Sequence, residues 1–385
     1  MAPAILALAW GGNHFSPLLL LYRQAEGYTQ VEVDLLFALY IVGIVPGFLL
    51  TGPLSDRYGR RRLLAVGAVV GCVASVVLAV GARSVMVLGA GRLLSGASVA
   101  VAMVVGSSWI KELSSPPHDT ASGPVAARRA SLTLTAGFGL GPAVSGLLAQ
   151  FGPAPTVLPY VVHVVITIPA ALLLAGAPET RSPAAGDRRP LLADLGVPRP
   201  VRGRFFGVVA PAAPWVFGCA GLAFAVTPAI VQARVGEGAV GYATLLAVVT
   251  LAFGASIQPF AVRIGAATGG RQLLVGLGLA LAGILLLALE AVVALPLLGL
   301  PIAALLGAAY GLCLVSGLTE VQRMARPDDL AGVTAVYYSL TYVGFVLPVV
   351  LAALTPLAPE WTLLLALAAL AALAMAVVAA RLGRS

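Results

Sequence analysis

Long apolar runs dominate this chain, and they have the length of membrane-spanning helices. Each run holds about 20 residues, which matches a hydrocarbon core of about 30 Å, and clear examples are 273–295 and 361–380. The strands of a membrane barrel would instead show runs of about 10 residues with alternating polarity. The pattern predicts an all-α membrane protein with twelve transmembrane helices, at 4–22, 33–52, 63–82, 85–110, 130–150, 157–177, 205–231, 240–262, 272–294, 299–319, 331–353 and 360–380.

The composition agrees with a lipid environment. Hydrophobic residues make up 60% of the chain and charged residues 10%, whereas an ordinary soluble domain carries about 25% charge. A soluble protein could not cover this much apolar surface with polar side chains. The first apolar run, 5–22, follows no charged segment, so we expect a spanning helix there rather than a cleaved signal peptide. The three cysteines fall inside apolar runs, without metal-ligand spacing.

Basic residues gather in alternate connections, and this bias predicts the orientation. One set of connections contains Arg23, Arg83 and Arg234 only. The opposite set holds the other loop cations, namely Arg57, Arg60, Arg61, Arg62, Lys111, Arg128, Arg129, six arginines from Arg181 to Arg204, Arg263, Arg271, Arg323, Arg326, Arg381 and Arg384. The positive-inside rule therefore predicts that both termini are cytoplasmic. Anionic lipid headgroups account for the net charge of +8 without nucleic acid.

A polar connection at 178–204, rich in Pro, Gly and Arg, separates six predicted helices from six. We expect an N-terminal bundle at 1–177, a cytoplasmic linker at 178–204 and a C-terminal bundle at 205–385. Two segment pairs support a duplicated unit, because each pair occupies the same place in its half. The sequence at 51–59 aligns with 257–265, and 134–142 aligns with 340–348.

The segment GPLSDRYGRRR at 52–62 lies between predicted helices two and three and resembles the signature loop of the major facilitator superfamily. This resemblance implies two pseudo-symmetric six-helix bundles that work by alternating access. It also implies that Asp56 helps to latch the two halves together, although the arginines could serve only to set topology. Gly59 would permit a tight turn and Gly52 a close helix approach. The predicted latch residues are Gly52, Asp56, Arg57, Gly59, Arg60 and Arg61.

Two helix motifs extend the resemblance. Arg92, Gly96 and Ala100 match a family pattern in helix four, where such an arginine is linked to proton transfer. We expect Arg92 to pair with Asp34 or Glu32, and a purely structural ion pair is the alternative. The predicted helix five resembles the motif of the twelve-helix drug/proton antiporters through Gly137, Gly141, Pro142 and Gly146. This motif favours export over import.

The family places helices one, four, seven and ten around a central cavity. Trp10, Asn13, His14 and Pro17 are spaced three or four apart, so they share a face that should point inward. His14 would serve proton coupling or substrate binding, or be a neutral histidine bonded to a neighbouring helix. Helix seven should be kinked, since it contains several prolines. The predicted substrate or proton pathway comprises Trp10, Asn13, His14, Asp34, Arg92, Trp215 and Tyr310.

For two other polar residues we expect structural rather than transport roles. Glu290 lies near the end of helix nine, and we expect its side chain to snorkel to the membrane interface. His163 in helix six is expected to be a packing residue.

These observations predict a secondary active transporter for a small molecule, most simply a proton-coupled exporter of an amphipathic or lipophilic compound. The alternative is a symporter or facilitator that imports a sugar or other metabolite. An enzyme is not expected, because the sequence lacks a catalytic metal set, a nucleophile elbow and a P-loop. We expect a monomer in a bacterial cytoplasmic (inner) membrane, driven by the proton gradient without a cofactor or metal.

Overall fold

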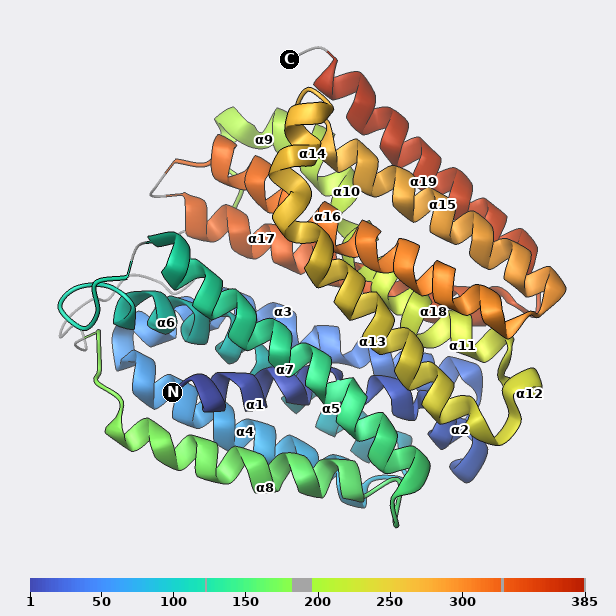
Figure 1. Ribbon diagram of the computed structural model, residues 1–385, viewed down its shortest axis with the longest axis horizontal. Coiled ribbons are helices and arrows are strands. Elements are labelled where there is room, and N and C mark those ends of the chain that lie inside the picture. The colour runs from blue at the N-terminus through green and yellow to red at the C-terminus, as the bar shows by residue number, and fades with distance from the viewer. Residues whose placement is uncertain (122, 182–195, 327–328, 384–385) are drawn as a thin grey trace. The chain divides into compact units, whose positions relative to one another are not determined.

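The computed structural model describes residues 1–121, 123–181, 196–326 and 329–383, and every regular element in this part of the chain is helical (Figure 1). Twelve helical stretches are long and apolar enough to cross a membrane, which confirms the predicted number. They are Ala2–Glu26, Gln30–Tyr58, Arg60–Val80, Val85–Leu113, Arg128–Phe151, Leu158–Gly176, Arg199–Ile230, Gln232–Ala267, Gln272–Val293, Pro296–Met324, Gly332–Leu354 and Glu360–Leu382.

The chain forms two compact units. Unit 1 comprises Met1–Tyr28 and Leu39–Ala193, and unit 2 comprises Thr29–Ala38 and Asp194–Ser385. Residues 182–195 of the predicted linker lie outside the described residues, and the predicted domain boundaries stay a prediction.

In unit 1, α1 packs against α7 and α8, and α4 packs against α5 and α8. Buried Ile5, Leu8 and Trp109 belong to its apolar core. The helices are α1 (Ala2–Asn13), α2 (Leu19–Glu26), α3 (Gln30–Tyr58, which begins in unit 2), α4 (Arg60–Val80), α5 (Val85–Val101), α6 (Ser107–Leu113), α7 (Gly123–Phe151) and α8 (Leu158–Leu172).

In unit 2, α16 packs against α10, α13 and α15, and α15 also packs against α19. The helices are α9 (Arg202–Arg204), α10 (Ala210–Gly221), α11 (Thr227–Ile230), α12 (Gln232–Val235), α13 (Ala239–Ile257), α14 (Ala261–Ala267), α15 (Gln272–Val293), α16 (Gly299–Met324), α17 (Leu330–Val343), α18 (Leu347–Leu354) and α19 (Glu360–Leu382).

Local sequence explains several helix ends. Thr29 and Glu32 form a reciprocal capping pair at the start of α3: Glu32 N–H donates to Thr29 Oγ1 at 3.2 Å, and Thr29 N–H donates to Glu32 Oε2 at 2.8 Å. Helix α2 ends at Gly27, whose φ of 73° suits a residue without a Cβ. Ser84 caps α5 by accepting from Val87 N–H.

Several membrane spans are interrupted. The first span breaks between α1 and α2, where Ser16–Leu18 form a short 3₁₀ turn. The seventh contains two π-helical segments, Phe205–Val209 and Leu222–Val226, on either side of α10. This confirms the predicted irregularity of helix seven. Such breaks free backbone groups in the membrane and recur where a span lines a functional site.

Close packing of α3 on α5 depends on glycine. A Cβ on Gly43 would lie 1.9 Å from Leu93 O, and a Cβ on Gly96 would lie 2.3 Å from Tyr40 O. The close approach predicted at Gly52 is wrong, because a Cβ there would meet only Val104 Cγ1, at an ordinary 3.8 Å. Gly43 of α3 and Gly96 of α5, rather than Gly52, therefore let these two backbones approach closely.

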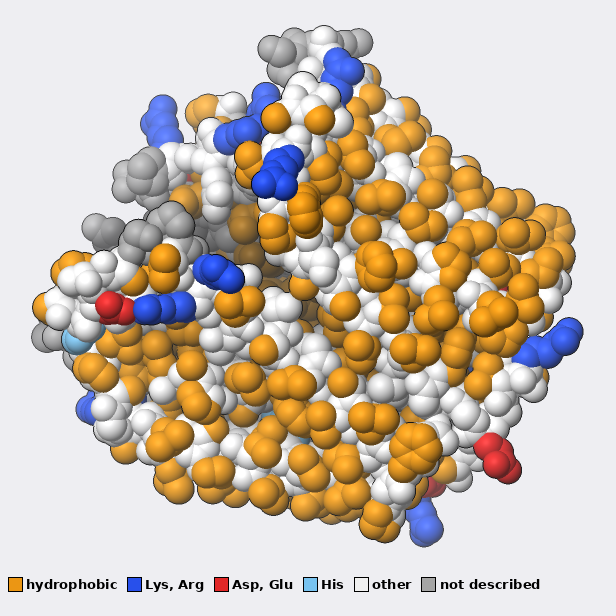
Figure 2. Space-filling view, in the orientation of Figure 1, with side chains coloured by type: hydrophobic (Ala, Val, Ile, Leu, Met, Phe, Trp, Pro, Cys, Tyr) orange, Lys and Arg blue, Asp and Glu red, His pale blue; other side chains and the backbone are white. Residues whose placement is uncertain are grey.

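Apolar side chains cover the lengths of the helices. Figure 2 shows them spread over the visible face, with Lys and Arg near helix ends. Large hydrophobic residues stand far out of each unit, including Met86 at 86% exposure and Phe151 at 79%. Water would penalise such a surface, whereas lipid solvates it. The fold is that of a multi-pass membrane protein.

Candidate functional site

His14 lies in the break of the first span. Helix α1 ends at Asn13, and Pro17, which has no N–H, sits in the 3₁₀ turn that follows. The side chain of His14 is fully buried. Its ring centroid lies 5.0 Å from those of Tyr160 and His163, both on α8, and it meets each ring edge to face. Within the described residues, neither ring nitrogen has a hydrogen-bond partner.

His163 of α8 is held by two other helices. Its Nε2 lies 2.9 Å from Ala7 O of α1, and its Nδ1 lies 2.8 Å from Ser75 Oγ of α4. Because a carbonyl oxygen can only accept, Nε2 donates to Ala7, while Nδ1 shares a hydrogen with the Ser75 hydroxyl. Both nitrogens of His163 are thus engaged within the protein, which agrees with the predicted packing role and contrasts with His14 beside it.

Arg92 is buried in α5 and lies between two aromatic rings. Its guanidinium carbon is 4.7 Å from the ring centroid of Phe15 and 4.7 Å from that of Tyr40. Electron-rich ring faces stabilise a desolvated cation by about 2 kcal/mol or more. Phe15 directly follows His14, so the break in the first span brings the cation and the imidazole to the same region of unit 1.

The other predicted residues of the first span are placed differently. Trp10 lines an apolar groove of about 480 Å³ formed by α1, α7 and α8, and its indole Nε1 is buried without a partner among the described residues. Asn13 is partly buried. Trp10 therefore faces the groove, while His14 contacts aromatic rings of α8.

Asp34 is buried near the start of α3 and accepts a hydrogen bond from Gln30 Nε2 at 2.8 Å. The carboxylate of Glu32 is engaged by Thr29 in the capping pair. The expected pairing of Arg92 with one of these carboxylates stays a prediction.

Aromatic rings cluster in unit 2. The ring of Phe217 on α10 lies 4.1 Å from Tyr342, 5.1 Å from Phe345 and 5.7 Å from Tyr310, measured between centroids. Tyr310 thus joins a group built from α10, α16 and α17 with its following turn. Trp215 is buried two residues from Phe217. The cluster offers broad apolar faces with few rotatable bonds.

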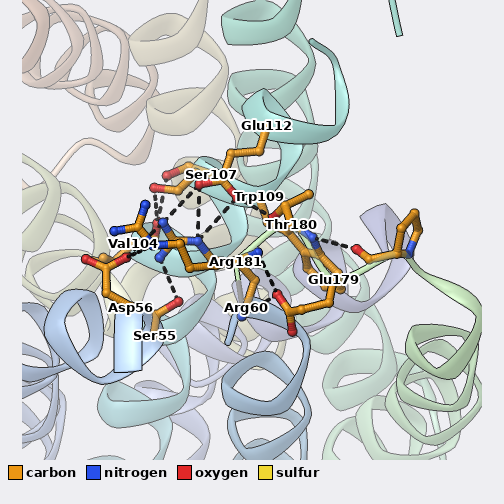
Figure 3. A network of polar contacts seen from close by, with 12 residues as sticks. Ser55, Asp56, Arg60, Val104, Ser107, Trp109, Glu112, Glu179, Thr180 and Arg181 are labelled. Carbon is orange, nitrogen blue, oxygen red and sulfur yellow. Dashed lines mark hydrogen bonds and ion pairs between the residues drawn. The ribbon is translucent and has the colours of Figure 1, made fainter. Parts of the chain in front are cut away.

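A polar network surrounds Arg60 at the junction of α3 and α4, as Figure 3 shows. The guanidinium donates to Ser55 Oγ at 2.8 Å and to Glu112 through Nε and Nη2, the latter at 2.9 Å. It also pairs with Asp56 at 3.1 Å. Glu112 comes from the last turn of α6 and accepts a second bond from Thr180. Arg60, at the start of α4, therefore connects the end of α3 with the end of α6.

Glu179 holds the start of α4. Its carboxylate accepts from the backbone N–H groups of Arg60, at 2.8 Å, and Arg61, at 3.0 Å. These are unsatisfied donors at a helix N-terminus, where the dipole also favours negative charge. Gly59, just before the helix, has a φ of 94°, which confirms the predicted tight turn. A Cβ there would lie 2.7 Å from Glu179 Oε2.

Asp56 has two cationic neighbours in this network. Besides Arg60, Arg181 Nε lies 3.4 Å from Asp56 Oδ1. Arg61 reaches Ala175 O of the segment after α8, at 3.3 Å. Of the predicted latch residues, the structure therefore joins Asp56, Gly59, Arg60 and Arg61 to one network.

Glycines of the predicted helix-five motif pack on α1. A Cβ on Gly137 would lie 2.4 Å from Leu6 O, and a Cβ on Gly141 would lie 2.5 Å from Trp10 O. Pro142 and Gly146 are buried in the same helix, α7. Unit 2 repeats this device between its first and fifth spans, since a Cβ on Gly344 would lie 2.0 Å from Pro214 O. The glycines of this motif therefore let the backbones of α7 and α1 approach closely.

Asp119, in the loop before the fifth span, accepts a hydrogen bond from Arg129. This bond, helped by the backbone N–H of Thr120, holds the pKa of the Asp119 carboxyl below its usual value. The pair joins the loop after α6 to the start of α7.

A family model described as Major Facilitator Superfamily matches residues 1–349. The chain belongs to this superfamily.

Solved transporters share the fold of this superfamily member. The structure of the POT family transporter PepTSo has a TM-score of 0.77 at 14% identity, covering 98% of this chain and 96% of that one. The nucleoside transporter NupG has a TM-score of 0.71 at 11% identity, with the same coverage. The human organic anion transporter MFSD10 (TETRAN) has a TM-score of 0.65 at 18% identity, covering 98% of each chain.

Two curated relatives of this superfamily member match over short stretches. A chloramphenicol resistance protein of Pseudomonas aeruginosa is 31% identical over 113 residues, which cover 29% of this chain and 27% of that protein. A probable glucose transporter, rco-3, of Neurospora crassa is 35% identical over 101 residues, 26% of this chain and 17% of that protein. Each match spans less than a third of the relative's length.

Glu112 and Phe217 of this superfamily member were not among the residues predicted from sequence, and the predicted position of Glu290 is wrong. The sequence could have indicated an ion pair for Glu112, because a carboxylate in the last turn of an apolar helix requires a nearby partner. For Phe217 the sequence carries no such indication, since aromatic residues are common in spans. Glu290 does not snorkel to the interface: its side chain is fully buried against the helices around α15.

Proposed function

We propose that this superfamily member is a secondary active transporter that exports a small amphipathic or lipophilic compound in exchange for protons, by alternating access. The observation that carries the proposal is His14. An imidazole ordinarily titrates near neutral pH, and this one is fully buried, at a helix break, with no hydrogen-bond partner for either nitrogen among the described residues. A buried polar group of this kind costs free energy unless a partner engages it. A proton or a polar group of the substrate would supply that partner.

Arg92 supports the same region as the coupling site. A cation within a span costs about 2.5–3.5 kcal/mol on insertion scales, and such residues usually serve function. The rings of Phe15 and Tyr40 stabilise this cation without neutralising it. We propose that Arg92 responds electrostatically when His14 gains or loses a proton. Asp34 remains a proposed residue of the proton pathway.

The substrate class follows from the aromatic cluster of unit 2. Phe217, Tyr310, Tyr342 and Phe345 present ring faces that suit apolar or aromatic groups of a ligand. Trp10 and Trp215 are the other aromatic residues proposed for the pathway. The match to a chloramphenicol resistance protein favours this class and export.

Import by symport is the second candidate. It is favoured by the match to a probable glucose transporter. Sugar binding needs several hydrogen-bonding side chains, whereas buried hydroxyls of the spans such as Ser95, Thr244 and Thr250 donate to backbone carbonyls of their own helices, so we rank import below export.

The direction of the imposed pH gradient separates the candidates. We propose to reconstitute the purified protein in liposomes and to measure accumulation of dyes, antibiotics and sugars. Antiport predicts accumulation when the lumen is acidic, symport predicts it when the lumen is alkaline, and a facilitator only equilibrates the substrate. An ionophore that collapses the gradient should abolish either accumulation.

His14→Ala tests the coupling site in the same liposomes. Proton-driven accumulation should be lost, while His118→Ala, which changes an exposed loop histidine, should leave it intact. Unchanged proton-driven transport by the His14 variant would reject the assignment.

We propose that the segment from Gly52 to Arg61, which includes Arg57, is a conformational latch. The network that holds Asp56 between Arg60 and Arg181 supports this role. Asp56→Asn should change the rate of transport while the fold is retained, and an unchanged rate would argue for a topological role alone.

The cellular setting is also a proposal. We place the protein as a monomer in a bacterial cytoplasmic membrane, with both termini and the Arg-rich loops in the cytoplasm, because of the positive-inside bias. Its partners would be the substrate, protons and lipid, with no nucleic acid and no cofactor.

A further inference from the structure

Glu290 is a buried carboxyl in unit 2 that the proposed transport pathway does not use. It lies three residues before the end of α15. Its side chain has 0% exposure, and neither carboxyl oxygen has a hydrogen-bond partner among the described residues. An ionised carboxylate in such a place would lose its hydration without compensation, at a cost of several kcal/mol.

The packing register places Glu290 beside the start of α16. Gly276 of α15 meets Cys313, and Gly283 meets Leu306. Seven residues forward on α15 therefore correspond to seven residues back on the antiparallel α16. One further step of seven brings Glu290 level with Gly299, the first residue of α16.

Tyr242 of α13 reaches the same place. Its hydroxyl lies 1.9 Å from the position of a Cβ on Gly299, and it donates to Pro296 O at 2.7 Å. Three helices of unit 2 thus converge on one carboxyl.

Other ionisable groups near this carboxyl are few. On α16, the first ionisable side chain is Tyr310, eleven residues from Gly299, or about 16 Å along the helix. On α19, Glu360 begins the helix and is partly exposed. Among the described residues of α10 and α11, the ionisable side chain is Cys219. It lies near the C-terminal end of α10, which the five-residue π-helical segment Leu222–Val226 separates from α11. No lysine, arginine or histidine of these helices meets Glu290 in the described structure.

We propose that Glu290 is a proton-binding site of unit 2, which holds its proton as a neutral carboxylic acid in this conformation. The proton would be released when α13, α15 and α16 separate enough to admit water to the carboxyl. A metal site does not fit, because Ca²⁺ or Mg²⁺ needs about six oxygen ligands and no group of three metal-capable side chains occurs among the described residues. This site is separate from His14 and does not depend on proton-coupled transport.

Infrared difference spectroscopy of the purified full-length protein tests the proposal. Spectra recorded between acidic and alkaline pH should contain a carbonyl band of a protonated carboxylic acid that Glu290→Gln abolishes. Glu237→Gln is the matched control, because it removes an exposed carboxyl of the neighbouring loop, and it should leave the band unchanged. Persistence of the full band in Glu290→Gln would overturn the proposal, as would a band that sodium ions displace at constant pH.

A second measurement uses the wild-type protein, in case Glu290→Gln does not fold. A lipid-soluble carbodiimide reacts with protonated carboxyl groups in apolar surroundings, and mass spectrometry locates the adduct. The adduct should form on Glu290 at neutral pH and be lost in alkali, and its absence at neutral pH would overturn the proposal. Failure of the liposome experiments would leave both readouts unaffected, so the two proposals can fail separately.

Discussion

Arg60→Ala should destabilise unit 1 more than the loss of any neighbouring arginine. The guanidinium is 11% exposed and Glu112 is 33% exposed, so their two-point bond is partly desolvated. Charged hydrogen bonds of this kind contribute about 1.5–3 kcal/mol. The pair with Asp56, whose side chain is 49% exposed, adds at most about 1 kcal/mol.

These contributions give an expected loss of roughly 2–4 kcal/mol in the free energy of unfolding. For a unit of this size, the corresponding decrease in Tm is roughly 5–15 °C. The assay is thermal unfolding in detergent, followed by far-ultraviolet circular dichroism at a fixed scan rate, because membrane proteins often unfold irreversibly.

Arg61→Ala is the matched control for this prediction. Arg61 is exposed and its side chain makes one hydrogen bond, to Ala175 O, so its loss should change Tm by no more than about 2 °C. A double-mutant cycle of Arg60→Ala with Glu112→Ala should show coupling of about 1–3 kcal/mol. Equal Tm decreases for the two arginine variants, or no coupling with Glu112, would refute the reasoning.

Three further predictions concern other parts of unit 1. Gly59→Ala should cost about 1–2 kcal/mol, because alanine disfavours the left-handed region that the turn uses, and Tm should decrease by a few degrees. Gly141→Leu should separate α7 from the backbone of α1 and reduce the yield of folded protein in size-exclusion chromatography, whereas Gly139→Leu, where a Cβ meets open space, should not. Asp119→Asn should lower Tm at neutral pH, since a carboxyl with a lowered pKa stabilises the fold above its usual pKa. That difference should vanish as the pH falls through the lowered pKa, and a difference that persists in acid would contradict the assignment.

Much of the fold could be predicted because the determining signals are local. Apolar runs of about 20 residues define the spans, and prolines predicted the irregular seventh span. The tight turn at Gly59 could be predicted because this glycine lies in a short polar connection between two such runs.

The surroundings of individual polar residues could not be predicted in the same way. Helix α15 is apolar on all sides, so no periodic pattern indicates which face is buried, and Glu290 was therefore placed at the interface. Arg60 meets Glu112, 52 residues away in sequence, and only the packed helices bring them together. The two buried histidines of unit 1, His14 and His163, differ in hydrogen bonding although both lie in apolar runs.

Distances between spin labels on the two units test the central claim of alternating access most directly. One label pair would sit at positions 115 and 268, in connections expected at the cytoplasmic end of the spans. The other pair would sit at 83 and 237, in connections expected at the opposite end, and the three cysteines would be replaced by serine. The account predicts that a change of pH or addition of substrate lengthens one distance and shortens the other. Distances that stay constant, or that change in the same direction at both ends, would contradict it.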